Sequence, residues 1–578
     1  MSLFIFFIFA AVLIGAGAML SPAWRTTQPR VALAATLCLA LVVGGAVFYA
    51  EAFGWDTLVV DYMLFALLSG VVLGGTLSTA QARAEARGER LEDRDQGWPG
   101  PGDLAFFAFA ALLLLIPHLH LPTPLGERGP ILSIHSLAVR EGGSFSSLDP
   151  YLPQERVIVS PGFHALSAYL SAQLDQSIPL IQLSVAAVVA LLLVWLAYDF
   201  GAELVDKRVG RAMAIATLLC LGLYRSYLDG HFAELLALLF MFAFLLYALR
   251  LSRKFNLADL VAAGLMLGAV AYTSLSLTLV TVLGWIALLV LVWTQERSKS
   301  TAVARWALTF AIPAIALLGI APWLVNNLPL IWPIRPSPFP ADLSNLFAII
   351  HEQGIVIALL ALRGLWISLR AKGTRRSVSL LMLMWLLLVI EFSCLGVIGR
   401  LLPPVGELTN APNLARHGLI LPFIWFGGVA LHEMWGERVA AAIKARMRKA
   451  AMPIIAIAAA LLIVLAVAFR ALLSVLGFPP AALSQDEVAA MTWLRDNAPP
   501  DAIVMAADGD AWLPVFSERR AIDIRALRYF EWDTVAGEYA SDSTVDYIVA
   551  RAGTKAPVDM PRNPAFEAGG VRVYHVTD

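Results

Sequence analysis

One feature repeats along most of the chain: runs of apolar residues long enough to cross a membrane, separated by short polar connections. A bilayer core of about 30 Å needs about 20 apolar residues in helical form, because lipid offers no hydrogen-bond partner to the backbone. We therefore expect a polytopic α-helical membrane protein. Its fourteen predicted spans lie near 3–20, 31–50, 57–77, 104–118, 178–198, 211–224, 231–249, 257–272, 275–294, 304–322, 347–369, 377–396, 417–435 and 451–475.

The composition excludes a soluble enzyme and a nucleic-acid-binding protein. Hydrophobic residues make up 59% of the chain and charged residues 15%, against about 45–50% and about 25% in ordinary soluble domains. With 42 Lys and Arg against 43 Asp and Glu, the net charge of −1 gives no basic surface for nucleic acid. The expected surroundings of the chain are membrane lipid.

The basic residues predict how the chain is oriented. Lys and Arg concentrate in one alternating set of connections, as at 83–94, 250–254, 370–376 and 438–449. Cytoplasmic loops carry the positive excess. An even number of spans then places both termini on the external side of the cytoplasmic (inner) membrane.

Two polar regions are long enough to hold chemistry, a loop at about 119–177 and a tail at about 477–578. In the tail, Ser484 and Glu487 form a capping-box pattern that opens a helix, and strand-like runs follow at 502–506, 512–516, 545–550 and 571–576. We expect three parts: additional N-terminal spans at 1–103, a transmembrane core at 104–476, and a small external α/β domain at 477–578.

The loop at 119–177 contains two predicted helices. Ile131, Ile134, Leu137 and Ala138 share one helical face, so the first helix should lie flat at the water–lipid boundary. A turn at Pro161-Gly162 starts the second, at 163–174. Such a loop can frame a cavity at the outer leaflet.

Five segments stand out by their order along the chain: Arg140-Glu-Gly-Gly143, Asp149-Pro-Tyr-Leu-Pro153, Pro161-Gly-Phe-His164, Asp229-Gly-His-Phe-Ala-Glu-Leu-Leu236 and Met491-Thr-Trp-Leu-Arg-Asp-Asn-Ala-Pro-Pro-Asp501. The first three make the loop resemble the first external loop of membrane-embedded GT-C fold glycosyltransferases, above all their bacterial and archaeal branch. The fourth segment, at the start of a span, and the fifth, in the tail, are also similar to that family. The resemblance covers about 104–578, so that the first three spans look like an addition.

The resemblance implies a GT-C-like fold and a reaction. A sugar, hexosyl or pentosyl, would pass from a polyprenyl-phosphate or polyprenyl-diphosphate donor to an acceptor at the external membrane face, by an inverting single displacement. This chemistry needs a carboxylate for the acceptor proton, a cation for the lipid phosphate and an apolar groove.

The catalytic base is where the sequence departs from the family, whose members usually carry an Asp near the start of the horizontal helix. Here that stretch begins Glu127-Arg128. Glu127 and Asp149 are the candidate bases. Arg128 would lower the pKa of an adjacent acid, or it faces the phosphate instead. The alternatives remain open: Glu127 as a solvated loop charge, and Asp149 as a turn residue before Pro150.

Substrate-binding candidates follow from the same likeness. Arg416 and His417 open a late span, where relatives place an Arg thought to meet the lipid-linked phosphate, and guanidinium suits phosphate bidentately. The alternative is an interfacial Arg that reaches lipid headgroups. His164 is a candidate contact to the donor or a residue that only holds the loop.

His231 and Glu234 lie three residues apart on one helical face. This spacing can hold a divalent cation such as Mg²⁺ or Mn²⁺, or it marks an interfacial hydrogen-bond cluster.

Two other functions remain open. A catalytically inactive GT-C-like scaffold would bind lipid or a partner protein through the same groove, and the missing Asp favours it. A transporter or flippase is disfavoured, because the spans carry few ionisable residues, mainly Asp61, Arg363 and Glu391.

Overall fold

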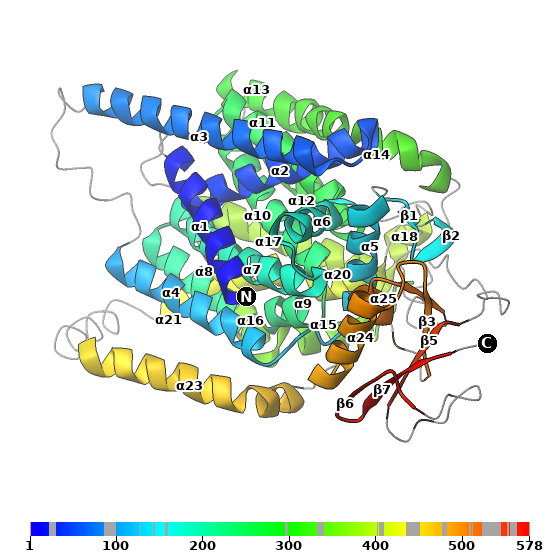
Figure 1. Cartoon of the computed structure of the whole chain (residues 1–578). Coiled ribbons are helices and arrows are strands. Elements are labelled where there is room, and N and C mark those ends of the chain that lie inside the picture. Colours follow the sequence, from blue (N-terminus) through cyan, green and yellow to red (C-terminus); the bar gives the residue numbers. More distant parts are fainter. Residues whose placement is uncertain are drawn as a thin grey trace.

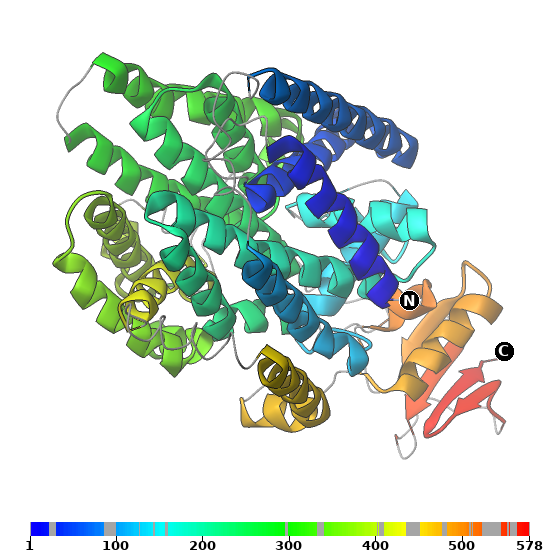
Figure 2. The same cartoon turned by 90° about the vertical axis from the view of Figure 1, so that its left-hand side faces the viewer.

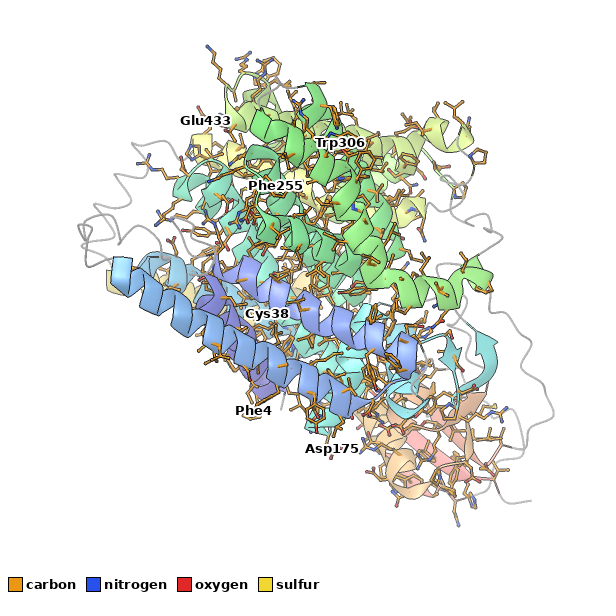
Figure 3. All side chains as sticks on the ribbon, turned by 90° about the horizontal axis from the view of Figure 1, so that it is seen from above. Phe4, Cys38, Asp175, Phe255, Trp306 and Glu433 are labelled. Atoms are coloured by element: carbon orange, nitrogen blue, oxygen red, sulfur yellow. The ribbon has the colours of Figure 1, made fainter. Side chains whose placement is uncertain are left out.

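The computed structural model describes residues 2–21, 30–85, 100–126, 128–142, 145–156, 160–294, 299–331, 340–401, 403, 410–434, 451–476, 483–507, 510, 512–522, 545–551, 554 and 563–576. A large helical bundle carries a small α/β domain at one end (Figure 1). We call this domain, within 483–576, the cap. In Figure 3, Asp175 lies next to the cap and Glu433 lies at the opposite end of the molecule.

Three N-terminal helices precede the core and pack on it. Tyr272 donates a hydrogen bond of 2.9 Å to the carbonyl oxygen of Ala40. Asp61 accepts hydrogen bonds from Tyr169 (2.5 Å) and Gln173 (3.1 Å). The helices are α1 (Ser2–Leu20), α2 (Val31–Phe53) and α3 (Thr57–Glu85).

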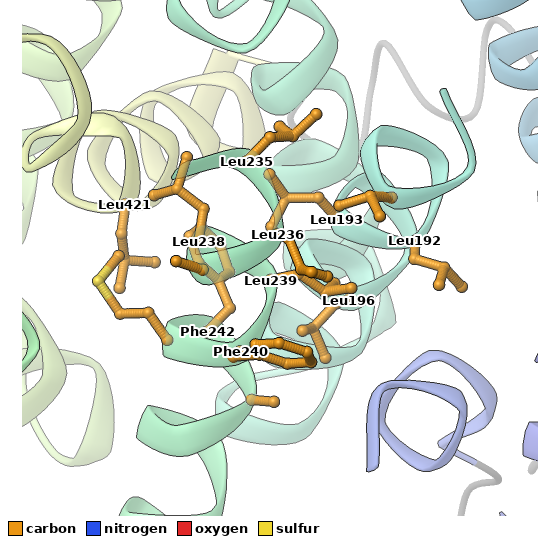
Figure 4. Close-up of a cluster of buried hydrophobic side chains, with 14 of the residues drawn as sticks. Leu192, Leu193, Leu196, Leu235, Leu236, Leu238, Leu239, Phe240, Phe242 and Leu421 are labelled. Atoms are coloured by element: carbon orange, nitrogen blue, oxygen red, sulfur yellow. The ribbon is translucent and has the colours of Figure 1, made fainter. Parts of the chain in front are cut away.

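The centre of the bundle is formed by two helices that are apolar on all sides, α7 (Ile178–Leu204) and α10 (Phe232–Arg253). A helix without a polar face is stable only when it is surrounded, and every residue in the apolar window of α10 is buried. Figure 4 shows Leu193 and Leu196 of α7 beside Leu236 and Leu239 of α10. This packed centre holds the helices whose ends form the site described below.

The remaining membrane helices surround this centre. Two glycines matter for their packing. Gly354, at φ 90°, joins α15 to α16 at a bend of 101°. Gly364 lets α16 approach α21 closely, since a Cβ there would lie 1.7 Å from the carbonyl oxygen of Phe426. α23 lies at the edge of the bundle (Figure 2). The helices are α4 (Pro101–Leu115), η3 (Ile116–Leu119), α8 (Lys207–Leu219), α9 (Leu221–Leu228), α11 (Leu257–Ala271), α12 (Leu275–Thr294), α13 (Lys299–Trp306), η4 (Ala307–Ala311), α14 (Ile312–Ile331), α15 (Asn345–Gln353), α16 (Ile355–Leu369), α17 (Thr374–Ile390), η5 (Glu391–Leu395), α18 (Val397–Leu401), α20 (Ala411–His417), α21 (Ile420–Met434) and α23 (Ala451–Val475).

The expected count of fourteen spans is not confirmed. Among the described residues, 11 helices are long and apolar enough to cross a membrane, or up to 12 with α15 and α16 counted as one bent span. The predicted span at 257–272 is the shorter apolar helix α11, of 15 residues. The predicted span at 211–224 is broken, because α8 ends before Cys220 and α9 starts after it. The chain is nevertheless a multi-pass membrane protein.

The external loop forms two helices and a hairpin, as α5 (Arg128–Gly142), β1 (Ser147–Leu148), β2 (Leu152–Arg156) and α6 (Gly162–Leu174). The expectation that α5 lies flat on lipid is corrected. Ile131, Ile134, Leu137 and Ala138 are buried in one hydrophobic cluster with residues of the cap. Protein covers the face that was expected to meet lipid.

The cap contains a five-stranded sheet in the order β4-β3-β5-β7-β6. Strands β4, β3 and β5 are parallel, whereas β7 pairs antiparallel with β5 and β6. This confirms the small C-terminal α/β domain. Its elements are α24 (Gln485–Asn497), β3 (Ile503–Ala506), α25 (Leu513–Ser517), β4 (Arg520–Ile522), β5 (Tyr547–Arg551), β6 (Phe566–Ala568) and β7 (Val571–His575).

Two local predictions in the cap have opposite outcomes. The capping box is confirmed, since the backbone N–H of Glu487 donates to the Ser484 hydroxyl (3.2 Å) and that of Ser484 donates to the Glu487 carboxylate (2.6 Å). The predicted strand at 512–516 is wrong, because it forms helix α25. Pro514 at the helix start donates no backbone hydrogen bond, and the run is buried on both sides rather than alternating.

Candidate active site

The site begins where two loops interlock, the one that precedes α5 and the one between α9 and α10. The backbone N–H of Leu125 donates to the carbonyl oxygen of Leu228 at 2.8 Å. A Cβ on Gly126 would lie 2.1 Å from the carbonyl oxygen of Asp229, and one on Gly230, at φ 84°, would lie 2.9 Å from the nitrogen of Gly129. Glycine alone permits this approach. It places Arg128 beside the start of α10.

Arg128 joins three elements. Its guanidinium donates to the Glu234 carboxylate of α10 at 2.6 Å and to the Asn413 side-chain oxygen of α20 at 3.1 Å. Asn413 is in turn fixed by the α20 cap, where the Asn410 side chain accepts its backbone N–H at 3.1 Å. The Arg128 side chain is 24% exposed, whereas that of Glu234 is 4% exposed. The carboxylate is therefore buried and the guanidinium partly open.

Arg416 forms the second half of the cluster. Its Nε lies 3.1 Å from Oε2 of Glu352, and its Nη2 donates to Oε1 of Glu352 at 3.3 Å. Its Nη1 also contacts Nε2 of His231. The Arg416 side chain is 26% exposed and that of Glu352 is 12% exposed. As with Arg128 and Glu234, a partly exposed guanidinium is paired with a more buried carboxylate.

Sequence reasoning missed Glu352, because nothing near it in the chain resembles a site motif. The bend between α15 and α16 brings it to the cluster. Gln353 beside it donates to the backbone carbonyl of Arg416. The apolar pattern at 347–369 predicted one straight span, which would have placed these two side chains within the membrane.

His231, Glu234 and His417 form a buried group whose ligand atoms all lie within 4.8 Å of one another. The Ser226 hydroxyl donates to the Gly222 carbonyl at 2.7 Å and lies 3.1 Å from Nδ1 of His417. His417 therefore donates through Nδ1 and keeps the lone pair on Nε2. Within the described part of the chain, neither this Nε2 nor Nδ1 of His231 has a hydrogen-bond partner.

Two imidazole nitrogens and one carboxylate would suit Zn²⁺ or Mn²⁺. Arg416 donates to Nε2 of His231, so Nδ1 of that ring carries the proton. A cation would bind through this Nδ1 only after Arg416 leaves Nε2 and the proton moves there. Mg²⁺ prefers an octahedral shell of oxygen atoms, so this group suits it poorly. The nearby Arg128 and Arg416 guanidiniums oppose any cation and require that an anion accompany it.

Asp229 is a further carboxylate at the site, on the loop between α9 and α10. Its Oδ1 is buried and has no hydrogen-bond partner among the described residues. Burial raises the pKa of Asp229 to about 6, although Arg416 and Arg225 nearby act in the opposite direction. A carboxylate of this kind is suited to accept a proton near neutral pH.

The other predicted site residues lie elsewhere. Glu127 lies outside the described residues. Asp149 is exposed beyond the far end of α5, where it accepts a hydrogen bond of 2.8 Å from Ser147. Since α5 has 15 residues, its length of about 22 Å separates Asp149 from the start of the helix. The structure does not bring Asp149 to the cluster.

His164 is buried on α6, where it contacts α5. The Ser136 hydroxyl donates to the Leu132 carbonyl at 2.9 Å and lies 3.1 Å from Nδ1 of His164. Burial lowers the pKa of His164 to about 4. His164 thus holds α6 against α5 and does not line the exposed side of the site.

Comparisons with known proteins define the fold. No protein-family model and no curated protein sequence matches the chain. Among solved structures, ArnT from Cupriavidus metallidurans bound to undecaprenyl phosphate is similar at a TM-score of 0.50 and 13% identity, over 82% of this chain and 98% of ArnT. The oligosaccharyltransferase of Archaeoglobus fulgidus in its apo form gives a TM-score of 0.46 and 13% identity, over 78% of this chain and 69% of that protein.

At this identity the likeness to ArnT establishes the fold and not the reaction. It confirms the fold that the loop motifs implied. The chain is a multi-pass membrane protein with the GT-C fold of membrane-embedded glycosyltransferases.

Proposed function

We propose that the chain is a glycosyltransferase that moves a sugar from a polyprenyl-phosphate or polyprenyl-diphosphate donor to an acceptor at the external membrane face. The observation that carries this proposal is the pair of guanidiniums, Arg128 and Arg416. They come from α5 and α20, each partly open and each resting on a more buried carboxylate. Guanidinium has five N–H donors, so each can meet phosphate oxygens while it keeps its carboxylate.

The fold supports the lipid character of the donor. ArnT, with the same fold, binds undecaprenyl phosphate in its crystal structure. The bundle of this chain offers apolar outer helix faces on which a prenyl chain would lie. We propose the external side of the cytoplasmic membrane because the Lys- and Arg-rich connections, such as those at 250–254 and 370–376, are typical of the cytoplasmic side.

The proposed reaction is a single displacement. An acceptor hydroxyl or amine attacks the anomeric carbon, a new bond forms to that carbon, and the bond to the donor phosphate oxygen breaks. The acceptor proton passes to a carboxylate, and the lipid phosphate leaves with the electron pair, held by Arg128 and Arg416. We propose Glu127 or Asp229 as the base; Asp149 lies too far along α5 for this role.

A divalent cation is part of the proposal. His231, Glu234 and His417 would hold it, and it would balance the charge on the departing phosphate. Purified protein should contain Zn²⁺ or Mn²⁺ by elemental analysis. His417→Ala should lose the metal, whereas His120→Ala, at a histidine that bonds to the Ala466 carbonyl, should keep it. Equal metal content in both variants would contradict this site.

The decisive test of the reaction is transfer of radiolabelled sugar from undecaprenyl-phosphate donors by reconstituted protein. Arg128→Ala, Arg416→Ala and the base variants Glu127→Gln and Asp229→Asn should reduce transfer by about 100-fold or more where the residue takes part. Arg400→Ala, at an exposed external arginine on α18, should transfer like wild type. Wild-type protein that transfers no sugar from any such donor would overturn the proposal.

A non-catalytic scaffold is the second candidate, and one observation favours it: each site arginine is already neutralised by a carboxylate. Lipid binding without transfer would support the scaffold. The transporter gains no support. Asp61 is bonded to Tyr169 and Gln173, and the Glu391 carboxylate accepts the backbone N–H of Ile398 at 2.6 Å, so both are structural.

A further inference from the structure

Helix α5 contacts two separate bodies through opposite faces. Its polar face is bonded to the membrane bundle: Ser133 donates to Gln182 of α7 at 2.8 Å, and Gln182 donates to Ser136 at 3.1 Å. Its apolar face, with Ile131 and Leu137, packs on the cap. The helix that carries Arg128 is thus enclosed between the bundle and the cap.

The cap contacts α5 at both ends. At the start, a Cβ on Gly129 would lie 3.0 Å from Cη2 and from Cζ2 of Trp512, so the indole ring rests on the residue next to Arg128. At the other end, Nη2 of Arg140 lies 2.9 Å from Oε2 of Glu518. Trp512 and Glu518 directly flank the short helix α25. We call these two contacts the clamp.

We infer that the clamp is a positioning device for the donor phosphate site, which makes Trp512, Arg140 and Glu518 positioning residues of the reaction. This inference rests on the proposed function. The geometry is that of a lever. Release at Trp512 frees the start of α5, and a tilt of about 10° about the far end of a helix of about 22 Å displaces that start by about 4 Å. Release at Arg140 tilts α5 about its start instead, which moves the Arg128 guanidinium, about 6 Å from the helix axis, by about 1 Å. Either shift would lengthen the hydrogen bonds of Arg128 to Glu234 and Asn413. A misplacement of about 1 Å already costs an enzyme heavily.

The Arg140 end allows the clamp to be tested without emptying a packed core. The side chains of Arg140 and Glu518 are 16% and 23% exposed. They line a cavity of about 550 Å³ together with Glu141, Asp175 and Arg495. Glu141 also pairs with Arg140 at 2.8 Å, and after the exchange it would face the arginine at position 518. The reversed charges therefore have room and a balancing partner, so the pair can be exchanged.

The experiment measures binding of undecaprenyl phosphate to the full-length protein in lipid nanodiscs. Trp512→Ala, Arg140→Glu and Glu518→Arg should each weaken binding by about tenfold. The exchanged pair Arg140→Glu with Glu518→Arg should restore binding to within about threefold of wild type, and Trp512→Phe should keep most of it. A role in cap stability alone would not give a rescue of lipid binding by exchanged charges.

The matched control is Trp493→Ala. Trp493 is a cap tryptophan that stacks on Phe566 with 5.5 Å between ring centroids and belongs to α24. This variant should lower the melting temperature of the protein and leave lipid binding unchanged. Unchanged binding in Trp512→Ala and Glu518→Arg, or an exchanged pair as weak as its parents, would overturn the clamp alone. Wild-type protein that binds no undecaprenyl phosphate would overturn the proposed function and the clamp with it.

Discussion

At the scale of single residues, the site consists of ion pairs in which the carboxylate is more buried than the guanidinium. Glu234 and Glu352 lie deeper than the guanidiniums that they hold. A buried carboxylate that loses its partner is costly, about 3–5 kcal/mol. Glu234 and Glu352 thus fix Arg128 and Arg416 toward the open side of the site, where both guanidiniums can meet the proposed donor phosphate while they keep their carboxylates.

This arrangement predicts that Arg128 has two effects, on the stability of the protein and on lipid binding, which a second substitution can distinguish. In metal-free protein, Arg128→Ala should lower both the melting temperature and the affinity for undecaprenyl phosphate, because Glu234 loses the guanidinium that balances its buried charge. Adding Glu234→Gln should recover most of the melting temperature, since the uncompensated charge is gone, but should not recover lipid binding. Thermal melts and binding measurements on both variants check this. Recovery of lipid binding in the double variant would show that Arg128 acts only as a structural partner.

The sequence predicted those site residues that stand near a recognisable motif or at the end of an apolar span. Arg128, Arg416, His417, His231 and Glu234 stand near motifs or at span ends, and the structure brings all five together. Glu352, Asn413 and Ser226 have no such mark. They reach the cluster through helix ends that are distant in sequence, and no pattern of residue types predicts that meeting.

At the scale of elements, the site depends on two loops that approach at backbone distance. Interlocked glycines fix the start of α5 against the start of α10. Long apolar runs predicted the helices well, because lipid and burial both demand backbone hydrogen bonds within the segment. The same pattern predicted no bend at Gly354 and no break at Cys220, because apolar periodicity carries no information about where a helix turns.

The close approach of the two loops predicts that one added methyl group, at Gly126, strongly weakens lipid binding. Gly126→Ala should force the two loops apart, because its Cβ would lie 2.1 Å from the carbonyl oxygen of Asp229. Undecaprenyl phosphate binding should fall by about tenfold or more. The control is Gly319→Ala, in α14, where no atom lies within 4 Å of the added carbon. Equal binding in the two variants would contradict a rigid interlock.

The capping box of α24 predicts a pH dependence. Burial acts to raise the pKa of Glu487, but hydrogen bonds from Ser484 and the nearby Arg551 together hold it below the usual range of a glutamate. A lowered carboxyl pKa adds stability that is present above the unfolded value and is lost as pH falls through the folded one. Glu487→Gln should therefore lower the melting temperature of the cap at pH 7, and the difference from wild type should shrink below about pH 4.5. A difference that does not change with pH would exclude this role of Glu487.

At the scale of the whole molecule, a membrane bundle and a cap meet across one helix, α5. The composition and the order of motifs predicted both parts, since an apolar chain with a polar tail leaves few other arrangements. They did not predict that the cap would cover the apolar face of α5. An amphipathic helix looks the same in sequence whether lipid or protein covers it.

The orientation of the molecule is open to direct measurement. All three native cysteines, Cys38, Cys220 and Cys394, are buried. A cysteine at the exposed position Asp501 in the cap should react with a membrane-impermeant maleimide in intact cells. One at the exposed position Arg376, in a basic connection, should react only after permeabilisation. The reverse pattern would place the cap in the cytoplasm.

The most direct test of the central claim is an experimental structure of the full-length protein with undecaprenyl phosphate. We predict that the lipid phosphate lies within about 3 Å of the guanidinium nitrogens of both Arg128 and Arg416, with its prenyl chain against the bundle. A phosphate bound elsewhere, with Arg128 still on Glu234 and Arg416 still on Glu352, would contradict the account.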